Sequence, residues 1–320
     1  MDASAASSGV AQRLLRYTSA VAACFVFADV VWGGIVRING AGMTCPDWPR
    51  CRGVWFPALD NQVALEWTHR FVAPLLTLLI LATIIAAWRA RRESPRAWRA
   101  SWWSGGLLVA QVLVGAVTIR FSNNPPSVAA HLGLGVLTFI SLLVVWYATL
   151  SRPISRGFEG PAALALTRLA FSSAIVTLAA IVAAGYMSAA NAGIACTGFP
   201  ICNGWGPAQT VLQQIHVGHR LLAYMAFALV IALASASSRT AAIPRDAARL
   251  ATSALVLAML QIALGVATVA SGLAPILRSL HQANGVLLLA SLSLATYALY
   301  SALPARSASP RSENALPQTS

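Results

Sequence analysis

Long apolar stretches alternate with short polar segments along the whole chain. Eight of these stretches reach the length of about 18 or more mainly apolar residues that a helix needs to cross a bilayer. Segments rich in turn-forming residues, such as SNNPPS and SSRTAAIPRD, separate them. The predicted spans are residues 17–38, 63–88, 100–120, 128–150, 167–190, 212–236, 249–271 and 278–302. The pattern predicts an all-α polytopic membrane protein.

Composition supports this fold class and argues against a nucleic-acid partner. The 320 residues are 58% hydrophobic and only 10% charged, whereas a soluble protein carries about 25% charged residues. The net charge is +13, but every basic residue is an arginine, and most arginines lie in the short segments between apolar runs. That placement is typical of a protein whose charges set its orientation in the membrane.

The arginines also predict which side of the membrane each segment faces. Fifteen of them fall in the two terminal tails and in the segments 89–99, 151–168 and 237–249, all on one side of the predicted topology. The positive-inside rule makes that side cytoplasmic. We therefore expect cytoplasmic termini, and loops 39–62 and 191–211 on the outer side. Three polar segments lie outside the predicted bundles: an N-terminal tail (1–16), a linker (151–166) and a C-terminal tail (303–320) that we expect to be disordered.

Two short cysteine loops lie in the outer segments. CPDWPRC runs from Cys45 to Cys51, and CTGFPIC runs from Cys196 to Cys202. Disulfides persist in oxidising compartments, and a metal site more often uses two- to four-residue gaps and four ligands, so the spacing favours two disulfides. Whether such a disulfide is structural or redox-active stays open. Cys24 lies inside the first span, where we expect a small buried apolar residue.

The chain contains an internal repeat with a period of about 150 residues. His69 and His219 are 150 positions apart, the two cysteine pairs are 151 apart, and QVLVGAVT is followed 150 residues later by QIALGVAT. Each copy holds four spans, so both copies enter the membrane from the same side, as in parallel repeats. The sequence predicts two tandem four-helix bundles, residues 17–150 and 167–302.

Four of the five histidines occupy equivalent depths in the two predicted bundles. His69, His131, His219 and His281 each lie within roughly two turns of the outer end of a span, about 10 Å deep. A single intramembrane histidine would often be a hydrogen-bonded core residue, but ionisable groups in lipid are costly and tend to be functional. Their pairing by depth and their repetition favour function. His216 is an additional histidine without an assigned role.

Two imidazoles facing each other inside a helix bundle suit the axial positions of a haem iron. Zinc or copper would normally take further ligands, and the only one foreseen at this depth is Glu66. Arginines near the outer boundary could pair with haem propionates through a two-pronged guanidinium contact, or could simply extend to the interface. Arg70 at the first haem and Arg220 at the second are the favoured propionate or loop partners. The arginines considered are Arg37, Arg70, Arg120, Arg220 and Arg278.

The two copies differ beside the first histidine of each pair. The first copy reads EWTHR and the second HVGHR, so Glu66 corresponds to His216. Residues three apart share a helix face, which predicts Glu66 next to His69. A carboxylate there could accept a proton or stabilise positive charge, or it could orient the imidazole by a hydrogen bond. The asymmetry favours one reactive site and one site that holds a cofactor.

Taken together, these motifs resemble those of the haem A synthase family. The matching segments are GGIVRINGAGMTCPDWPRC, EWTHRF, CTGFPICNG, HVGHR and HQANGVL, spread over about residues 30–290. The resemblance implies an eight-span oxidoreductase of a bacterial plasma membrane. It implies oxidation of the methyl group of haem O to the formyl group of haem A for terminal oxidases, by two hydroxylations followed by loss of water.

The resemblance also implies roles for individual residues. The N-terminal bundle would accept haem O between His69 and His131, with Glu66 as the essential carboxylate. The C-terminal bundle would hold haem b, with its iron ligated by His219 and His281. The cysteine loops would be closed by the disulfides Cys45–Cys51 and Cys196–Cys202. The second loop departs from the first, because it reads TGFP where the first has an Asp-Trp pair.

The expected partners are haem O, haem O synthase, an electron acceptor and membrane lipid. The sequence names neither the acceptor nor the oligomeric state, so a homo-oligomer stays open. Two other functions fit the histidine pattern. A dihaem electron-transfer cytochrome would hold two equivalent haems and would not need Glu66. A haem carrier or assembly chaperone would bind haem weakly in one half and leave its chemistry unchanged.

Overall fold

The computed structural model describes residues 3–150 and 157–304, and over those ranges it is helical apart from the connecting loops, the longest of which carry the cysteine pairs. The prediction of eight membrane-spanning helices is confirmed, because eight described helices are long and apolar enough to cross a bilayer. They are α1 (Ala3–Ile38), α2 (Asn61–Arg89), α3 (Pro95–Arg120), α4 (Pro125–Ala148), α5 (Gly160–Ala189), α6 (Val211–Arg239), α7 (Arg245–Ala270) and α8 (Pro275–Ala302).

Capping residues define where several helices begin. The side chain of Asp60 accepts hydrogen bonds from two backbone amides at the start of α2, and Thr210 forms a capping box with Gln213 at the start of α6. Proline occupies the first turn of α3, α4, α5 and α8, where its missing amide proton costs nothing.

Two helices extend beyond the spans predicted for them, into the segments predicted as a tail and a linker. Within the predicted tail 1–16 the described residues are helical from Ala3 onward, and the guanidinium of Arg16 donates to the Thr149 carbonyl at the end of α4 (3.0 Å). Likewise α5 begins at Gly160 inside the predicted linker. The rest of the linker up to residue 156, and the predicted disordered tail from residue 305, lie outside the described residues.

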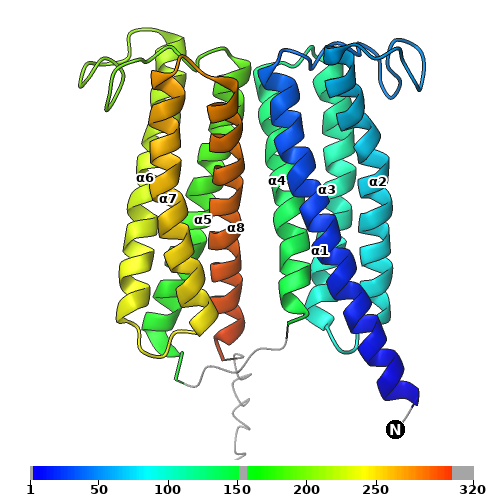
Figure 1. Cartoon of the computed structure of the whole chain (residues 1–320). Helices are drawn as coiled ribbons and strands as arrows, with labels where there is room; N and C mark the ends of the chain where they lie inside the picture. The colour runs from blue at the N-terminus through cyan, green and yellow to red at the C-terminus, as the bar shows by residue number, and fades with distance from the viewer. Residues whose placement is uncertain (1–2, 151–156, 305–320) are drawn as a thin grey trace, which may run out of the picture.

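The helices form two groups of four, α1–α4 and α5–α8, which lie next to each other (Figure 1). Both cysteine loops lie at the same end of the molecule, which we call the disulfide end. Buried positions are rich in alanine, including Ala86, Ala87, Ala251 and Ala254. Small side chains let membrane helices approach closely where lipid gives no hydrophobic drive for association.

The two groups meet through related contacts. Gly34 of α1 faces Gln282 of α8, and Gly185 of α5 faces Leu132 of α4. Both glycines and both facing residues correspond in the repeat, at offsets of 151 and 150. One contact is polar, since the Gln282 amide donates to the Val30 carbonyl (2.9 Å). The other contact is made by an apolar leucine.

Cys24 was expected to be buried, and this was wrong. It is a free and exposed cysteine on the surface of α1, while its neighbours Ala22, Ala23 and Val26 are buried. The helical period turns the buried positions toward the bundle and leaves Cys24 on the outward face, where apolar side chains of a membrane protein meet lipid.

Candidate functional site

The first histidine pair lies inside the first group of helices. His69 comes from α2 and His131 from α4, and their ring centroids are 6.3 Å apart with the rings nearly perpendicular (84°). The Nδ1 atom of His69 lies 2.8 Å from an Asp29 carboxylate oxygen on α1. This contact leaves Nε2 as the nitrogen of His69 that is available to a ligand.

The second pair repeats this arrangement in the second group. The ring centroids of His219 and His281 are 6.5 Å apart at an interplanar angle of 77°. The Nδ1 atom of His219 lies 3.1 Å from the backbone carbonyl oxygen of Ala180 on α5. The Gln261 amide lies 3.2 Å from Nε2 of His281, and the corresponding glutamine, Gln111, lies beside His131 in the first group.

Both pairs fit a metal held between two imidazoles. A metal about 2 Å from one nitrogen of each ring would keep the ring centroids roughly 6 Å apart. The second ring of each pair also has a buried nitrogen, Nδ1 of His131 and Nδ1 of His281, with no hydrogen-bond partner among the described residues. In the described chain no group of three or more acidic, cysteine or histidine side chains gathers there, so each site offers two imidazoles rather than the three or four ligands that a zinc site takes.

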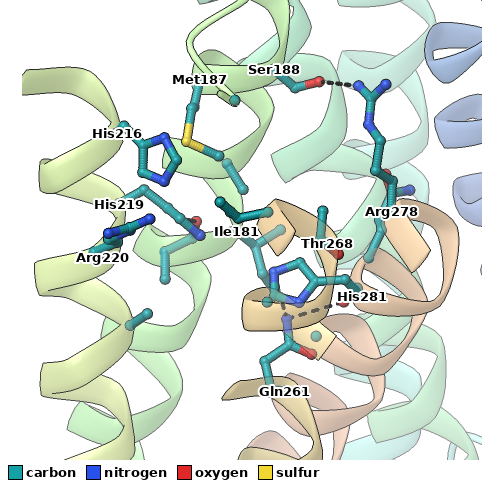
Figure 2. A pocket seen from close by; sticks show the side chains of 18 of the residues that line it. Ile181, Met187, Ser188, His216, His219, Arg220, Gln261, Thr268, Arg278 and His281 are labelled. Carbon is teal, nitrogen blue, oxygen red and sulfur yellow. Dashed lines mark hydrogen bonds between the residues drawn. The ribbon is translucent and has the colours of Figure 1, made fainter. Parts of the chain in front are cut away.

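A cavity of about 380 Å³ surrounds the second pair (Figure 2). Its volume lies within the range of ligand pockets, which are typically about 300–1,000 Å³ and mostly apolar. Apolar side chains such as Ile181 and Met187 line it, and His216, His219 and His281 project from opposite walls. The second group of helices therefore contains a mainly apolar pocket with the two imidazoles of the pair on its walls.

Two arginines at the disulfide end of this cavity are the cations best placed to meet a ligand. Arg37 comes from α1 of the first group and Arg278 from α8, and both line the cavity. Arg37 donates to Gln282 (3.2 Å) and Arg278 to the Ser188 hydroxyl (3.1 Å). Neither forms an ion pair with an acidic side chain in the described residues, and Nη1 of Arg37 is buried without a partner there. This arrangement suits the carboxylates of a bound ligand.

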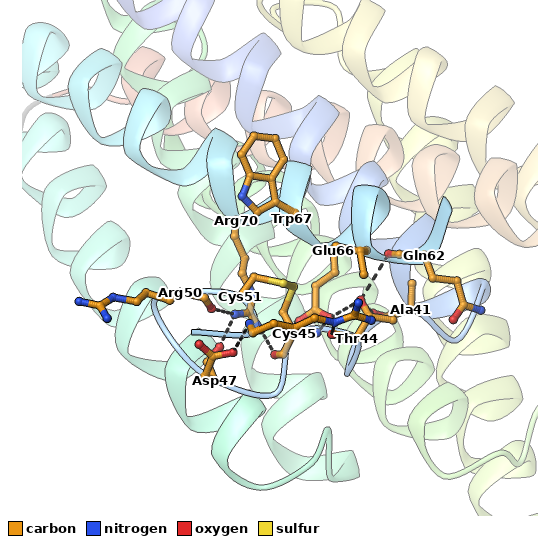
Figure 3. The surroundings of a disulfide bond; sticks show 12 residues. Ala41, Thr44, Cys45, Asp47, Arg50, Cys51, Gln62, Glu66, Trp67 and Arg70 are labelled. Carbon is orange, nitrogen blue, oxygen red and sulfur yellow. Dashed lines mark hydrogen bonds and ion pairs between the residues drawn. A yellow bond between two sulfur atoms is a disulfide. The ribbon is translucent and has the colours of Figure 1, made fainter. Parts of the chain in front are cut away.

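Arg70 holds the first cysteine loop. Its guanidinium donates to the backbone carbonyls of Cys45 (2.5 Å), Arg50 (2.7 Å) and Asp47, and it pairs with Glu66 at 2.5 Å (Figure 3). The Cys45 and Cys51 sulfurs are at disulfide distance, which confirms that pair. Of the two roles foreseen for Arg70, the structure shows loop binding, and contact with haem stays a prediction.

Arg220 holds the second loop in the same way. It donates to the carbonyls of Cys196 (2.9 Å), Gly198 (2.6 Å) and Ile201 (2.7 Å), which correspond by the offset of 151 to the three carbonyls bound by Arg70. The second predicted pair, Cys196 and Cys202, is also at disulfide distance. The repeat therefore preserves an arginine clamp under each loop. By contrast, Arg120 is exposed at the end of α3.

Glu66 and His216, the pair that differs between the copies, both contact the loops. The buried Glu66 carboxylate accepts from the Thr44 hydroxyl (2.9 Å) and the Cys45 amide (2.8 Å), and His216 lies 3.0 Å from the Ala192 carbonyl oxygen. The sequence predicts Glu66 next to His69, with a hydrogen bond to the imidazole as one alternative; the contacts that the structure describes for its carboxylate oxygens are with the loop and with Arg70.

The carboxylate in contact with His69 is Asp29, which the sequence analysis did not single out. A signal was present, because Asp29 is the only acidic residue within the predicted span 17–38. Ionisable residues inside a span are functional candidates by default.

Asp47 stabilises the first loop from within. Its carboxylate accepts hydrogen bonds from the backbone amides of Gly53 (2.9 Å) and Arg52 (2.6 Å), and the hydrogen bond from Gly53 is the main reason that its pKa is lowered. The second loop has Gly198 at this position, where an added Cβ would lie 2.7 Å from the Cys202 carbonyl oxygen. The Asp-to-Gly difference thus follows from two different loop packings.

These features define a class: a multi-pass helical membrane protein with two similar paired-histidine sites under arginine-clamped disulfide loops. The cytochrome oxidase assembly protein family (COX15-CtaA) matches residues 16–65 and 58–293. The chain belongs to that family, since the match covers most of its length.

Individual relatives agree with this assignment. The chain is 29% identical over 217 residues to a protein of Bacillus licheniformis named heme A synthase, covering 66% of this chain and 71% of the relative. A protein of the same name from Shouchella clausii is 28% identical over 269 residues, covering 80% and 86%. One from Bacillus mycoides is 25% identical, covering 69% and 72%.

Proposed function

We propose that this protein is a haem A synthase, an oxidoreductase that converts the methyl group of haem O to the formyl group of haem A. The observation that carries the proposal is a repeated paired-histidine site in which only the first copy has a carboxylate on its histidine. His69 contacts Asp29, whereas His219 contacts a backbone carbonyl. The names of the relatives support the same function.

The two groups of helices would bind different haems. Haem O, the substrate, would lie between His69 and His131, and haem b would lie between His219 and His281 as the resident cofactor. Bound haem b would supply the one-electron redox chemistry of its iron. In the second cavity, the mainly apolar lining would exclude water around bound haem, and Arg37 would pair with a haem carboxylate through its Nη1, which has no partner among the described residues.

The reaction needs acceptors for both electrons and protons. Turning a methyl group into a formyl group with oxygen from water releases four electrons and four protons, and the electrons would leave to an external electron acceptor. Glu66 is the proposed proton acceptor of this chain. Its Oε1 contacts Arg70, and its Oε2 accepts from Thr44 and Cys45, so a proton on Glu66 would weaken the hold on the first loop.

The proposed location is a bacterial plasma membrane, with both termini in the cytoplasm and both cysteine loops outside. Two observations support this orientation. Arginines are concentrated at the end of the molecule opposite to the loops, and disulfides persist in an oxidising compartment. The partners we propose are haem O and the enzyme that makes it, haem O synthase.

Haem extraction and chromatography would test the proposal. Cells that make haem O are compared with and without this protein, and a new haem A peak is the expected result. If haem O alone persists while the purified protein carries two haems, a dihaem electron-transfer cytochrome replaces the proposal. If the protein binds haem weakly and releases it unchanged, a haem carrier replaces it.

The matched variant is Glu66→Gln, which keeps the size of the side chain and removes its charge. We expect this variant to retain bound haem and to lose conversion of haem O, because a neutral amide is a poor proton acceptor. Conversion at the wild-type rate would show that Glu66 serves only to hold the loop through Thr44 and Arg70.

A further inference from the structure

Asp29 marks a difference in charge between two sites that otherwise have the same shape. It lies on α1 with its side chain largely covered, at 14% exposure, and its carboxylate is 2.8 Å from Nδ1 of His69. In the second group, the offset of 151 that relates Gly34 to Gly185 places Ala180 at the corresponding position. There the backbone carbonyl of that alanine accepts the same hydrogen bond from His219.

The comparison separates two roles that a histidine partner can have. An acceptor on Nδ1 fixes the tautomer and the orientation of the ring, and a carboxylate or a carbonyl can do this equally well. The second site shows that a carbonyl is enough, since its ring centroids are 6.5 Å apart compared with 6.3 Å in the first site. Orientation alone therefore does not require Asp29. What the carboxylate adds is negative charge.

We infer that Asp29 is a positioning residue that holds Nε2 of His69 toward the substrate iron and makes this imidazole a stronger electron donor than His219. A carboxylate on the far nitrogen raises the basicity of a ligating histidine, and hydrogen bonding around an axial ligand tunes the reduction potential of haem iron. The inference rests on the proposed function, because it places a haem between His69 and His131. It gives that first haem a lower reduction potential than a neutral partner would.

The test is a spectroelectrochemical titration of the purified, haem-loaded full-length protein at one fixed pH, with the Asp29→Asn variant compared with wild type. Asparagine keeps an oxygen that can accept from Nδ1 and removes the charge. The titration step that His69→Ala abolishes is assigned to the first site. We expect Asp29→Asn to favour the reduced form there by about tenfold, which converts to about 59 mV for one electron. The second step should not move, and it reports that the variant is folded.

A companion variant separates charge from orientation. Asp29→Ala removes both, and we expect haem binding at the first site to weaken by about 10- to 100-fold, while Asp29→Glu should restore the potential at least in part. An unchanged first-site potential in Asp29→Asn would overturn the inference and leave the proposed function standing if haem A is still made. If Asp29→Asn shifts the first-site potential but the wild-type protein makes no haem A, the inference is supported and the proposed function is overturned. A wild-type protein with no haem step that depends on His69 would overturn both.

Discussion

The arginine clamp under the second loop offers a direct test of how the loops are held. Arg220 is buried, at 6% exposure, and donates three hydrogen bonds of 2.6–2.9 Å to loop carbonyls. We expect Arg220→Ala to release the loop, because each of these carbonyls loses its charged donor. Water that enters at the membrane surface would replace only part of the interaction.

The expected size follows from the contacts. A hydrogen bond to a charged group contributes about 1.5–3 kcal/mol, so three would give about 4.5–9 kcal/mol if they were additive. Leaving one buried carbonyl without its donor costs about 1–3 kcal/mol, and since water would satisfy part of the demand, we take about 3–4 kcal/mol for the three carbonyls together as the net effect on loop opening. Since 1.4 kcal/mol is a factor of ten, loop amides should exchange roughly 10²- to 10³-fold faster.

Hydrogen exchange measured by mass spectrometry on the protein in lipid nanodiscs would follow this change. The peptide to monitor contains Ile201, whose amide donates to the Gly204 carbonyl (3.0 Å). The matched control is Arg239→Ala, an exposed arginine at the opposite end of the same helix, which should leave loop exchange unchanged. Arg220→Lys should fall in between, because one ammonium group cannot span three carbonyls. Exchange in Arg220→Ala within threefold of wild type would refute the clamp.

Three other predictions follow from the described contacts. Asp47→Asn should speed exchange in the first loop at pH 7. Because the pKa of Asp47 is lowered on folding, its contribution is present above the unfolded pKa of about 3.9 and is lost as the pH falls through the folded pKa, so the exchange rates of the two proteins should converge below that folded pKa. Gly34→Ala should lower the thermal midpoint, since its Cβ would displace Gln282 and cost about 1–2 kcal/mol; Gly106→Ala, with open space around it, should not, and equal midpoints would contradict this packing. His281→Ala should remove the haem b absorption spectrum of the purified protein, and a normal spectrum would overturn its assignment as a ligand.

The number of helices was predictable from the sequence because lipid imposes a simple requirement. A span must satisfy all its backbone groups internally and be apolar over about 20 residues, and both conditions leave a direct trace in the sequence. The helix ends were less predictable. α1 continues to Ala3 beyond its predicted span, and Arg16 in this extension donates to the Thr149 carbonyl at the end of α4, a contact that depends on tertiary structure.

The histidine pairs were predictable because the repeat places the same residue at the same depth twice. Asp29 was not predicted, because it lies on α1, a helix without a histidine, and its counterpart in the second copy is an alanine. The role of Arg70 could not be decided from the sequence, because its partners are backbone carbonyls. Any sequence has such carbonyls, and only the path of the loop brings them to one guanidinium.

Arg37 contributes to a site that lies in the other repeat. It belongs to the first repeat, yet it lines the cavity of the second and is held there by Gln282. The second cavity is therefore lined by residues from both repeats. A fragment made of residues 157–304 alone would keep His219 and His281 but would lose this cation and the α1 surface, so the two repeats are not interchangeable modules that could be separated and recombined.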